Sequence, residues 1–257
     1  MLTRSPDAPA PGAARLAALR RDAWREAVPC FLLLAALAAL LGHLGEFGPW
    51  FQIKSLAVFA TAFALVLAGL AAHAPNTRFG AANRVTLARL ALIAMLAALI
   101  GEPGDDAVAW GSIVVATSAA LLDALDGPLA RRGGLASDFG ARFDMETDAL
   151  LVLVLSLLVV HFGKAGAWIV AAGLMRYAFV LAARPWPWLA RALPPSGRRK
   201  TVCVVQITSL IVCLGPVITP PWSRALAAAS LALLAASFAI DIAWLLRHRH
   251  LPPETAT

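Results

Sequence analysis

The sequence predicts an all-α protein, a polytopic bundle of transmembrane helices, and three features of its composition support this fold class. Apolar residues make up 60% of the 257 residues, charged residues make up only 14%, and the mean hydropathy is +0.75. Soluble domains carry about 25% charged residues. A composition this apolar, in a chain of this length, is typical of a protein that crosses the membrane several times.

Eight apolar segments are long enough to cross a bilayer as helices, because one span needs about 20 predominantly apolar residues. The first two form an added N-terminal hairpin, and the other six form a continuous core; they lie at 28–45, 54–73, 85–101, 107–125, 143–162, 165–183, 201–218 and 224–246. The sequence thus predicts four parts, which are an N-terminal tail (1–27), the hairpin (28–74), the six-helix core (75–247) and a C-terminal tail (248–257).

Basic residues predict the orientation of these spans, since cytoplasmic loops carry an excess of Lys and Arg. Of the 22 Lys and Arg residues, Lys54, Lys164 and Arg224 fall in one set of loops, and Arg89 and Arg176 fall inside spans. The other 17 lie in the opposite loops and tails. Both termini are therefore expected in the cytoplasm. The net charge of +7 is attributed to basic loops that face anionic lipid, and nothing resembles a nucleic-acid-binding module.

Four aspartates lie where two consecutive core spans meet the cytoplasmic surface. Asp123 and Asp126 are three residues apart at the end of one span, and Asp144 and Asp148 are four residues apart at the start of the next. Both spacings place the paired side chains on one face of a helix. Because the two spans are antiparallel neighbours joined by a short loop, the two pairs are expected to converge.

Four carboxylates that converge at the edge of a bilayer repel one another and are costly to remove from water, and bound cations relieve both costs. An all-oxygen set without His or Cys suits Mg²⁺ or Mn²⁺. Two such ions could clamp a diphosphate and activate an attacking hydroxyl. The sequence therefore predicts a two-ion site at the cytoplasmic membrane surface.

Residues beside the acids fit the binding of a phosphorylated ligand. Gly127 lacks a Cβ and allows a ligand to approach the backbone, and Gly140 could do the same from the second helix. Ala130 has a small side chain and leaves room for a ligand on the same face of the helix as Gly127. Arg131 could bind a phosphate through two hydrogen bonds.

The whole run reads Asp123-x2-Asp126-Gly127-x2-Ala130-Arg131-x8-Gly140-x3-Asp144-x3-Asp148. It resembles the signature of the CDP-alcohol phosphotransferases, also called CDP-alcohol phosphatidyltransferases, membrane enzymes that make phospholipids from CDP-linked donors. The resemblance covers roughly residues 75–247. Two flanking stretches are also similar to family segments, namely Asn83-x2-Thr86-x2-Arg89 and Gly197-Arg198-Arg199-Lys200-Thr201. Pro128, inside the signature, is a departure that is expected to kink the helix.

The resemblance implies a six-helix catalytic core and a role for each signature position. All four aspartates would hold the two metal ions, with Asp144 and Asp148 catalytic and Asp148 acting as the general base toward the acceptor hydroxyl. The CDP site would be formed by Asp123, Asp126, Gly127, Ala130, Arg131 and Gly140, together with Asn83 and Thr86. CDP-diacylglycerol would be the donor and CMP the product. Dimerisation through the core spans is an expectation from the family alone.

The acceptor alcohol is predicted from a second group of basic residues. Arg176 lies inside a span, where a lone arginine needs a partner, either the signature aspartates or a phosphate of the acceptor. Arg198, Arg199 and Lys200 lie near the same cytoplasmic side. Together they favour a phosphorylated acceptor such as glycerol 3-phosphate, while serine, inositol, inositol phosphate and choline stay open.

Two other kinds of membrane protein compete with this interpretation. An aromatic prenyltransferase also holds a diphosphate through magnesium on two Asp-rich segments, but the glycine, alanine and arginine positions and the closeness of the two segments argue against it. A cation transporter would place its acids near the middle of the membrane and use broken helices. Here the acids cluster at one surface.

Overall fold

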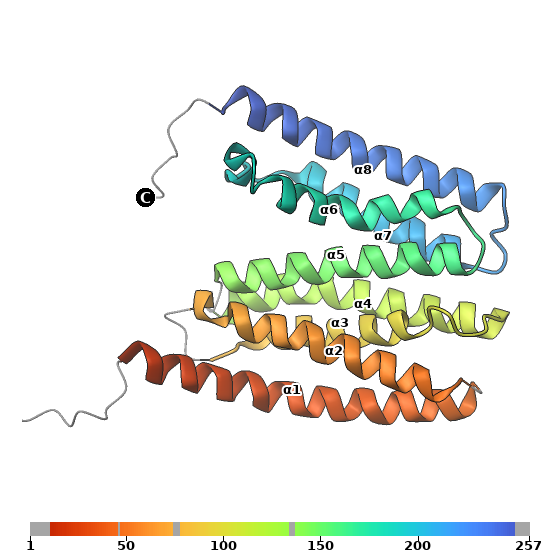
Figure 1. The fold of residues 1–257 in the computed structure, drawn as a ribbon, viewed down its shortest axis with the longest axis horizontal. Helices are drawn as coiled ribbons and strands as arrows, with labels where there is room; N and C mark the ends of the chain where they lie inside the picture. The colour runs from red at the N-terminus through yellow and green to blue at the C-terminus, as the bar shows by residue number, and fades with distance from the viewer. Residues whose placement is uncertain (1–10, 46, 74–77, 134–136, 250–257) are drawn as a thin grey trace, which may run out of the picture. The chain divides into compact units, whose positions relative to one another are not determined.

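The computed structural model describes residues 11–45, 47–73, 78–133 and 137–249, and for residues 124–133 it describes the helix but not the side chains. The described residues form eight α-helices joined by turns and short 3₁₀ helices (Figure 1). These are α1 (Pro11–Leu44), α2 (Pro49–Gly69), α3 (Ala81–Ala98), α4 (Asp106–Gly133), α5 (Asp138–His161), α6 (Val170–Ala182), α7 (Gly197–Leu214) and α8 (Trp222–Arg247). The predicted all-helical class is confirmed.

Five of the described helical segments are long and apolar enough to cross a membrane. They run over Gly12–Leu44, Pro49–Ala72, Ala81–Ala98, Asp106–Asp123 and Trp222–Arg247, and Ala167–Ala182 is a shorter apolar helix. Many large apolar side chains, such as Leu32, Leu65 and Ile240, are exposed on these helices. Lipid tails are as apolar as these side chains, so their exposure fits an integral membrane protein.

The described chain divides into two compact units, and each is described by itself. Of the described residues, the first unit contains those up to 103 and those from 115 to 148, and the second contains those from 104 to 114 and those from 149 onward. The division falls inside α4 and α5, so each of these helices contributes to both units.

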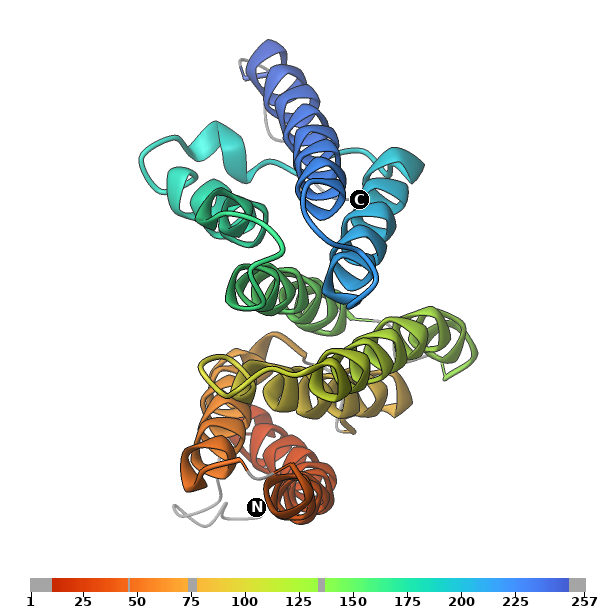
Figure 2. The same ribbon diagram turned by 90° about the vertical axis from the view of Figure 1, so that its right-hand side faces the viewer.

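In the first unit, α1, α2 and α3 pack side by side (Figures 1 and 2). Ala38, Phe51 and Ala98, one from each helix, form a buried apolar cluster. Helix α1 begins at Pro11, well before the span predicted at 28–45, because Leu19, Ala23 and other small or apolar residues at helical spacing give its first turns a buried face.

The hairpin of α1 and α2 is joined to α3 by polar contacts at both ends of α3. At its start, Asp22 accepts a hydrogen bond from the backbone N–H of Phe79 at 2.8 Å, and Glu26 lies 3.7 Å from Arg84. At the other end, the Lys54 ammonium lies 2.6 Å from Glu102. Such pairs contribute little energy where they are exposed, but they fix how the hairpin sits on α3.

Two local features determine where the helices of the site begin. Gly80 caps α3 at φ 88°, in the left-handed region that favours glycine. Ser137 caps α5, because its hydroxyl accepts a hydrogen bond from the N–H of Gly140 at 3.1 Å. An aromatic cluster of Phe79, Phe139 and Phe143, with ring centroids 6.1 to 6.5 Å apart, then packs the first turns of α5 against the start of α3.

In the second unit, α7 and α8 pack along each other, and α6 contacts α8 (Figure 2). Gly173 on α6 allows a very close approach to α5, because a Cβ at that position would lie 2.3 Å from the Cα of Leu153. The Lys164 ammonium donates hydrogen bonds to the carbonyls of Gly215 and Ile218, just after α7 ends. These contacts fix the connections at one end of the unit.

Candidate metal centre and active site

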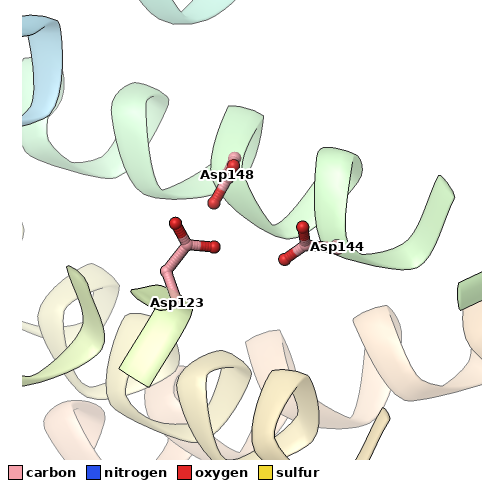
Figure 3. Close-up of side chains that lie close together, drawn as sticks. All are labelled: Asp123, Asp144 and Asp148. Carbon is pink, nitrogen blue, oxygen red and sulfur yellow. The ribbon is translucent and has the colours of Figure 1, made fainter. Parts of the chain in front are cut away.

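Three of the four predicted aspartates come together in the first unit, at the meeting of α4 and α5 (Figure 3). Asp123 lies on α4, and Asp144 and Asp148 lie one turn apart on α5. One carboxylate oxygen from each residue lies within 4.8 Å of the other two. These three carboxylates therefore converge, as the spacing of the acids on the two helices predicted.

A single arginine from a third helix contacts all three carboxylates. Arg89 on α3 is fully buried, and its Nη1 lies 2.8 Å from Asp123 Oδ1 and 2.5 Å from Asp144 Oδ1. Its Nη2 donates to Asp148 Oδ1, and its Nε donates to the carbonyl of Ala119 on α4 at 3.2 Å. Arg89 thus joins α3, α4 and α5 at one point.

The carboxylates lie on the more open side of this arrangement. Their side chains keep between 24% and 38% of their surface exposed, whereas the Arg89 side chain keeps none. Three oxygen ligands without a described His or Cys among them suit a hard cation such as Mg²⁺ or Mn²⁺. The described residues therefore fit a divalent metal ion, and an ion could approach them from the side opposite the guanidinium.

Gly140 lies beside the predicted nucleotide-binding residue Asn83. A Cβ on Gly140 would lie 3.1 Å from Asn83 Oδ1, which is tight, so glycine lets α5 approach α3 here. Asn83 and Thr86 are both buried, and each donates a side-chain hydrogen bond one turn back along the chain, to Phe79 and Ala82 respectively. In this structure they support the helix that carries Arg89.

The remaining signature side chains lie outside the described ones. Helix α4 continues past Pro128 and ends at Gly133. The side chains of Asp126, Ala130 and Arg131, and the surroundings of Gly127, are not described. The fourth ligand and this part of the nucleotide site stay predictions.

A second charged cluster belongs to the second unit and involves the predicted acceptor residues. Arg198 lies at the start of α7 and donates to Asp241 Oδ1 at 2.5 Å and to the carbonyl of Ser237 at 2.7 Å, both on α8. Arg199 lies 3.4 Å from the same Asp241 oxygen and donates to the carbonyl of Pro194. Lys200 is exposed on the same turn. One carboxylate therefore anchors two arginines at this end of α7 and α8.

Arg176, the other predicted acceptor residue, lies on α6 in the same unit. Its Nε is buried, and the side chain does interact with the surrounding protein. Gln206 on α7 is almost fully buried, and neither polar atom of its amide has a hydrogen-bond partner among the described residues. The sequence did not predict this buried amide.

The residues that carry this geometry also carry a family match. The family model described as CDP-alcohol phosphatidyltransferase matches residues 79–241. The chain belongs to the CDP-alcohol phosphatidyltransferase family. The match begins at Phe79, just before α3, and ends at Asp241 on α8, so it includes Arg89, the aspartates and the arginines at the start of α7. The resemblance seen in the sequence is confirmed, and the hairpin of α1 and α2 lies outside the family match.

One curated relative is 32% identical over 107 residues, the CDP-diacylglycerol–glycerol-3-phosphate 3-phosphatidyltransferase of Bacillus subtilis (strain 168). The aligned part covers 36% of this chain and 53% of the relative, so the chain spans about half the length of that protein. No solved structure matched the chain.

The role of Arg89 is the main feature of the site that sequence reasoning missed. Its position in the Asn83-x2-Thr86-x2-Arg89 stretch was apparent, but its partners lie 34 to 59 residues further along the chain. The available signal was the cost of an arginine within an apolar span, which demands an anionic partner nearby. The same cost predicts a partner for Arg176, the other arginine inside a predicted span.

Proposed function

We propose that this family member transfers a phosphatidyl group from CDP-diacylglycerol to the hydroxyl of glycerol 3-phosphate and releases CMP, with two Mg²⁺ or Mn²⁺ ions bound by the aspartates. The convergence of Asp123, Asp144 and Asp148 within 4.8 Å carries the proposal. The family match supports the reaction class, and the similarity to the Bacillus CDP-diacylglycerol–glycerol-3-phosphate 3-phosphatidyltransferase supports the donor and the acceptor.

The proposed reaction is a nucleophilic displacement at phosphorus. The oxygen of the acceptor hydroxyl forms a bond to the phosphorus that carries the diacylglycerol, and the bond to the bridging oxygen of the diphosphate breaks. The electron pair of that bond leaves with CMP. Asp148, as general base, takes the proton of the acceptor hydroxyl. When bound, divalent ions supply positive charge to the phosphates and lower the pKa of the attacking hydroxyl.

The chain's own residues would hold the donor in place for this attack. Asp123, Asp126, Asp144 and Asp148 would bind the two ions, and Asp123 and Asp126 would also contribute to the CDP site. The nucleotide would lie against the small residues Gly127, Ala130 and Gly140. It would be held by the positive charge of Arg131 and by the polar side chains of Asn83 and Thr86. Backbone that a ligand can approach closely is what a diphosphate requires.

The acceptor phosphate is assigned to the basic residues of the second unit, which are Arg176, Arg198, Arg199 and Lys200. Arginine binds phosphate through two parallel hydrogen bonds, and lysine adds a point charge. Two arginines share one anchoring carboxylate, Asp241, so their combined charge is only partly balanced within the cluster. This excess of positive charge supports an anionic acceptor over serine, inositol or choline.

The proposed enzyme lies in the cytoplasmic membrane with its site and both termini in the cytoplasm. The distribution of Lys and Arg among the loops supports this orientation. Dimerisation through the core helices is part of the proposal on family grounds. Membrane lipid supplies the donor directly, since CDP-diacylglycerol resides in the bilayer.

The deciding experiment measures CMP release by the purified protein with CDP-diacylglycerol, Mn²⁺ and one acceptor at a time. Glycerol 3-phosphate, serine, inositol, inositol phosphate and choline are compared, and each reaction is repeated in EDTA. We expect metal-dependent CMP release with glycerol 3-phosphate. Release with another acceptor alone would reassign the acceptor and keep the reaction class.

Two outcomes would contradict the proposed reaction class itself. Release of inorganic diphosphate from a prenyl diphosphate donor, without CMP from any CDP-linked donor, would point to a prenyltransferase-like enzyme. Metal uptake into proteoliposomes without CMP release would point to a cation transporter. Running the three assays on one preparation of folded protein separates the alternatives.

A further inference from the structure

Arg89 is a buried cation placed among acids that are proposed to bind cations. Its side chain is fully buried, and its guanidinium contacts Asp123, Asp144 and Asp148 through the Oδ1 atom of each. These acids come from two helices, and the arginine comes from a third. Without a cation, three carboxylates this close together would repel one another and separate the helices.

We propose that Arg89 is the resident counter-cation of the acidic cluster, holding the three carboxylates together before any metal ion arrives. Arg89 is thus a positioning residue, which acts on the proposed reaction through the aspartates. The inference rests on the proposed metal site and adds to it that the site is preassembled by a charge belonging to the protein.

The balance of charge supports this role. One guanidinium faces three described carboxylates, so the cluster keeps an excess of negative charge for divalent ions. The arginine lies on the buried side and the carboxylates on the more open side, so Arg89 does not obstruct the approach of an ion. Arg89 can therefore reduce the repulsion without replacing the metal.

The shape of the side chain matters as well as its charge. The Nε is held by the carbonyl of Ala119 at 3.2 Å, which fixes the plane of the guanidinium and directs its two terminal nitrogens at the aspartates. Lysine carries a compact charge on a flexible stem and cannot reproduce this planar fork. A lysine at position 89 should thus keep the charge and lose the alignment.

The test compares thermal unfolding of the purified protein with Arg89→Met, with and without Asp144→Asn, in EDTA and in saturating Mn²⁺. In EDTA, we expect Arg89→Met to lower Tm by about 10 °C, as breaking a buried ion pair does. Adding Asp144→Asn should restore part of that loss, because it removes one of the repelling charges. Mn²⁺ should raise the Tm of Arg89→Met more than that of the unsubstituted protein.

Two matched variants separate charge from packing. Arg89→Lys should lose about half as much Tm in EDTA as Arg89→Met, and it serves in place of Arg89→Met if that variant does not fold. Lys54→Met breaks an ion pair away from the acidic cluster, between α2 and Glu102 just after α3, and its Tm loss should be the same in EDTA and in Mn²⁺.

Equal losses of Tm for Arg89→Met in EDTA and in Mn²⁺, with no recovery on adding Asp144→Asn, would overturn the proposal and make Arg89 a packing residue. The comparison of single and double variants in EDTA needs neither metal nor substrate. Its failure is therefore distinguishable from failure of the proposed reaction, which CMP release tests separately.

Discussion

The two units of the protein contain charged clusters of opposite composition. In the first unit one buried arginine, Arg89, serves three aspartates, whereas in the second unit one aspartate, Asp241, serves Arg198 and Arg199. The first cluster has an excess of negative charge and the second an excess of positive charge. Each excess is unfavourable for the protein alone and favourable for a ligand of the opposite charge, as expected where function limits stability.

The largest expected effect comes from removing one acid of the first cluster. Asp148→Asn should lower the rate of CMP release by roughly 10³-fold or more, because it removes both the proposed base and a metal ligand. Its Tm in EDTA should stay the same or rise, since two carboxylates then share Arg89. Glu146→Gln, an exposed acid on the same helix, is the control and should keep its activity. If Asp148→Asn kept most of its activity, Asp148 could not be the general base.

A smaller effect, on stability instead of turnover, is expected from removing the acid of the second cluster. Asp241→Asn leaves two arginines without their shared carboxylate, so Tm should fall by about 5 °C. CMP release per folded molecule should change less than about ten-fold, because Asp241 contacts no reacting atom. Ser237→Ala, which removes only a hydroxyl that accepts from Arg198, should lower Tm less. If Asp241→Asn abolished turnover at unchanged Tm, the contrast between the clusters would fail.

The smallest effect concerns spacing within the first unit. Gly140→Ala places a Cβ 3.1 Å from Asn83 Oδ1, so the start of α5 should shift by a few tenths of an ångström and carry Asp144 with it. We expect CMP release to fall a few-fold, because small displacements of reacting groups are costly. Asn83→Ala removes the crowded oxygen but also a proposed contact to the nucleotide, so it should lower CMP release by itself. If crowding is the cause, adding Gly140→Ala to Asn83→Ala should lower CMP release no further. Steady-state rates of the single and double variants provide the check.

Much of the fold and part of the site follow from sequence patterns that act over short distances. Apolar length predicted the helices, and acids at helical spacing on adjacent spans predicted that Asp123, Asp144 and Asp148 converge. The start of α1 at Pro11 was not predicted, because its first turns contain several arginines that obscure the buried face formed by Leu19 and Ala23.

Contacts between distant residues were harder to predict. Nothing in the local sequence of Arg89 indicates that its partners are on α4 and α5, since the contact depends on how three helices pack. Likewise, nothing in the local sequence indicated that Arg198 and Arg199 would share Asp241 on α8. Long-range partners require the tertiary arrangement, which a single sequence does not provide.

The contacts at the two ends of α3 have a practical consequence for anyone who shortens the chain. Helix α3 is about 27 Å long, and the N-terminal hairpin holds it near both ends, through Asp22 and Glu26 at the start and Lys54 after the end. A version trimmed to the family-matched region would lose these contacts at both ends of the helix that carries Arg89. It would also expose Phe79 N–H and Glu102 together with the apolar face that α2 now covers. The hairpin lies outside the family match, yet in this protein it packs against the helix that carries Arg89.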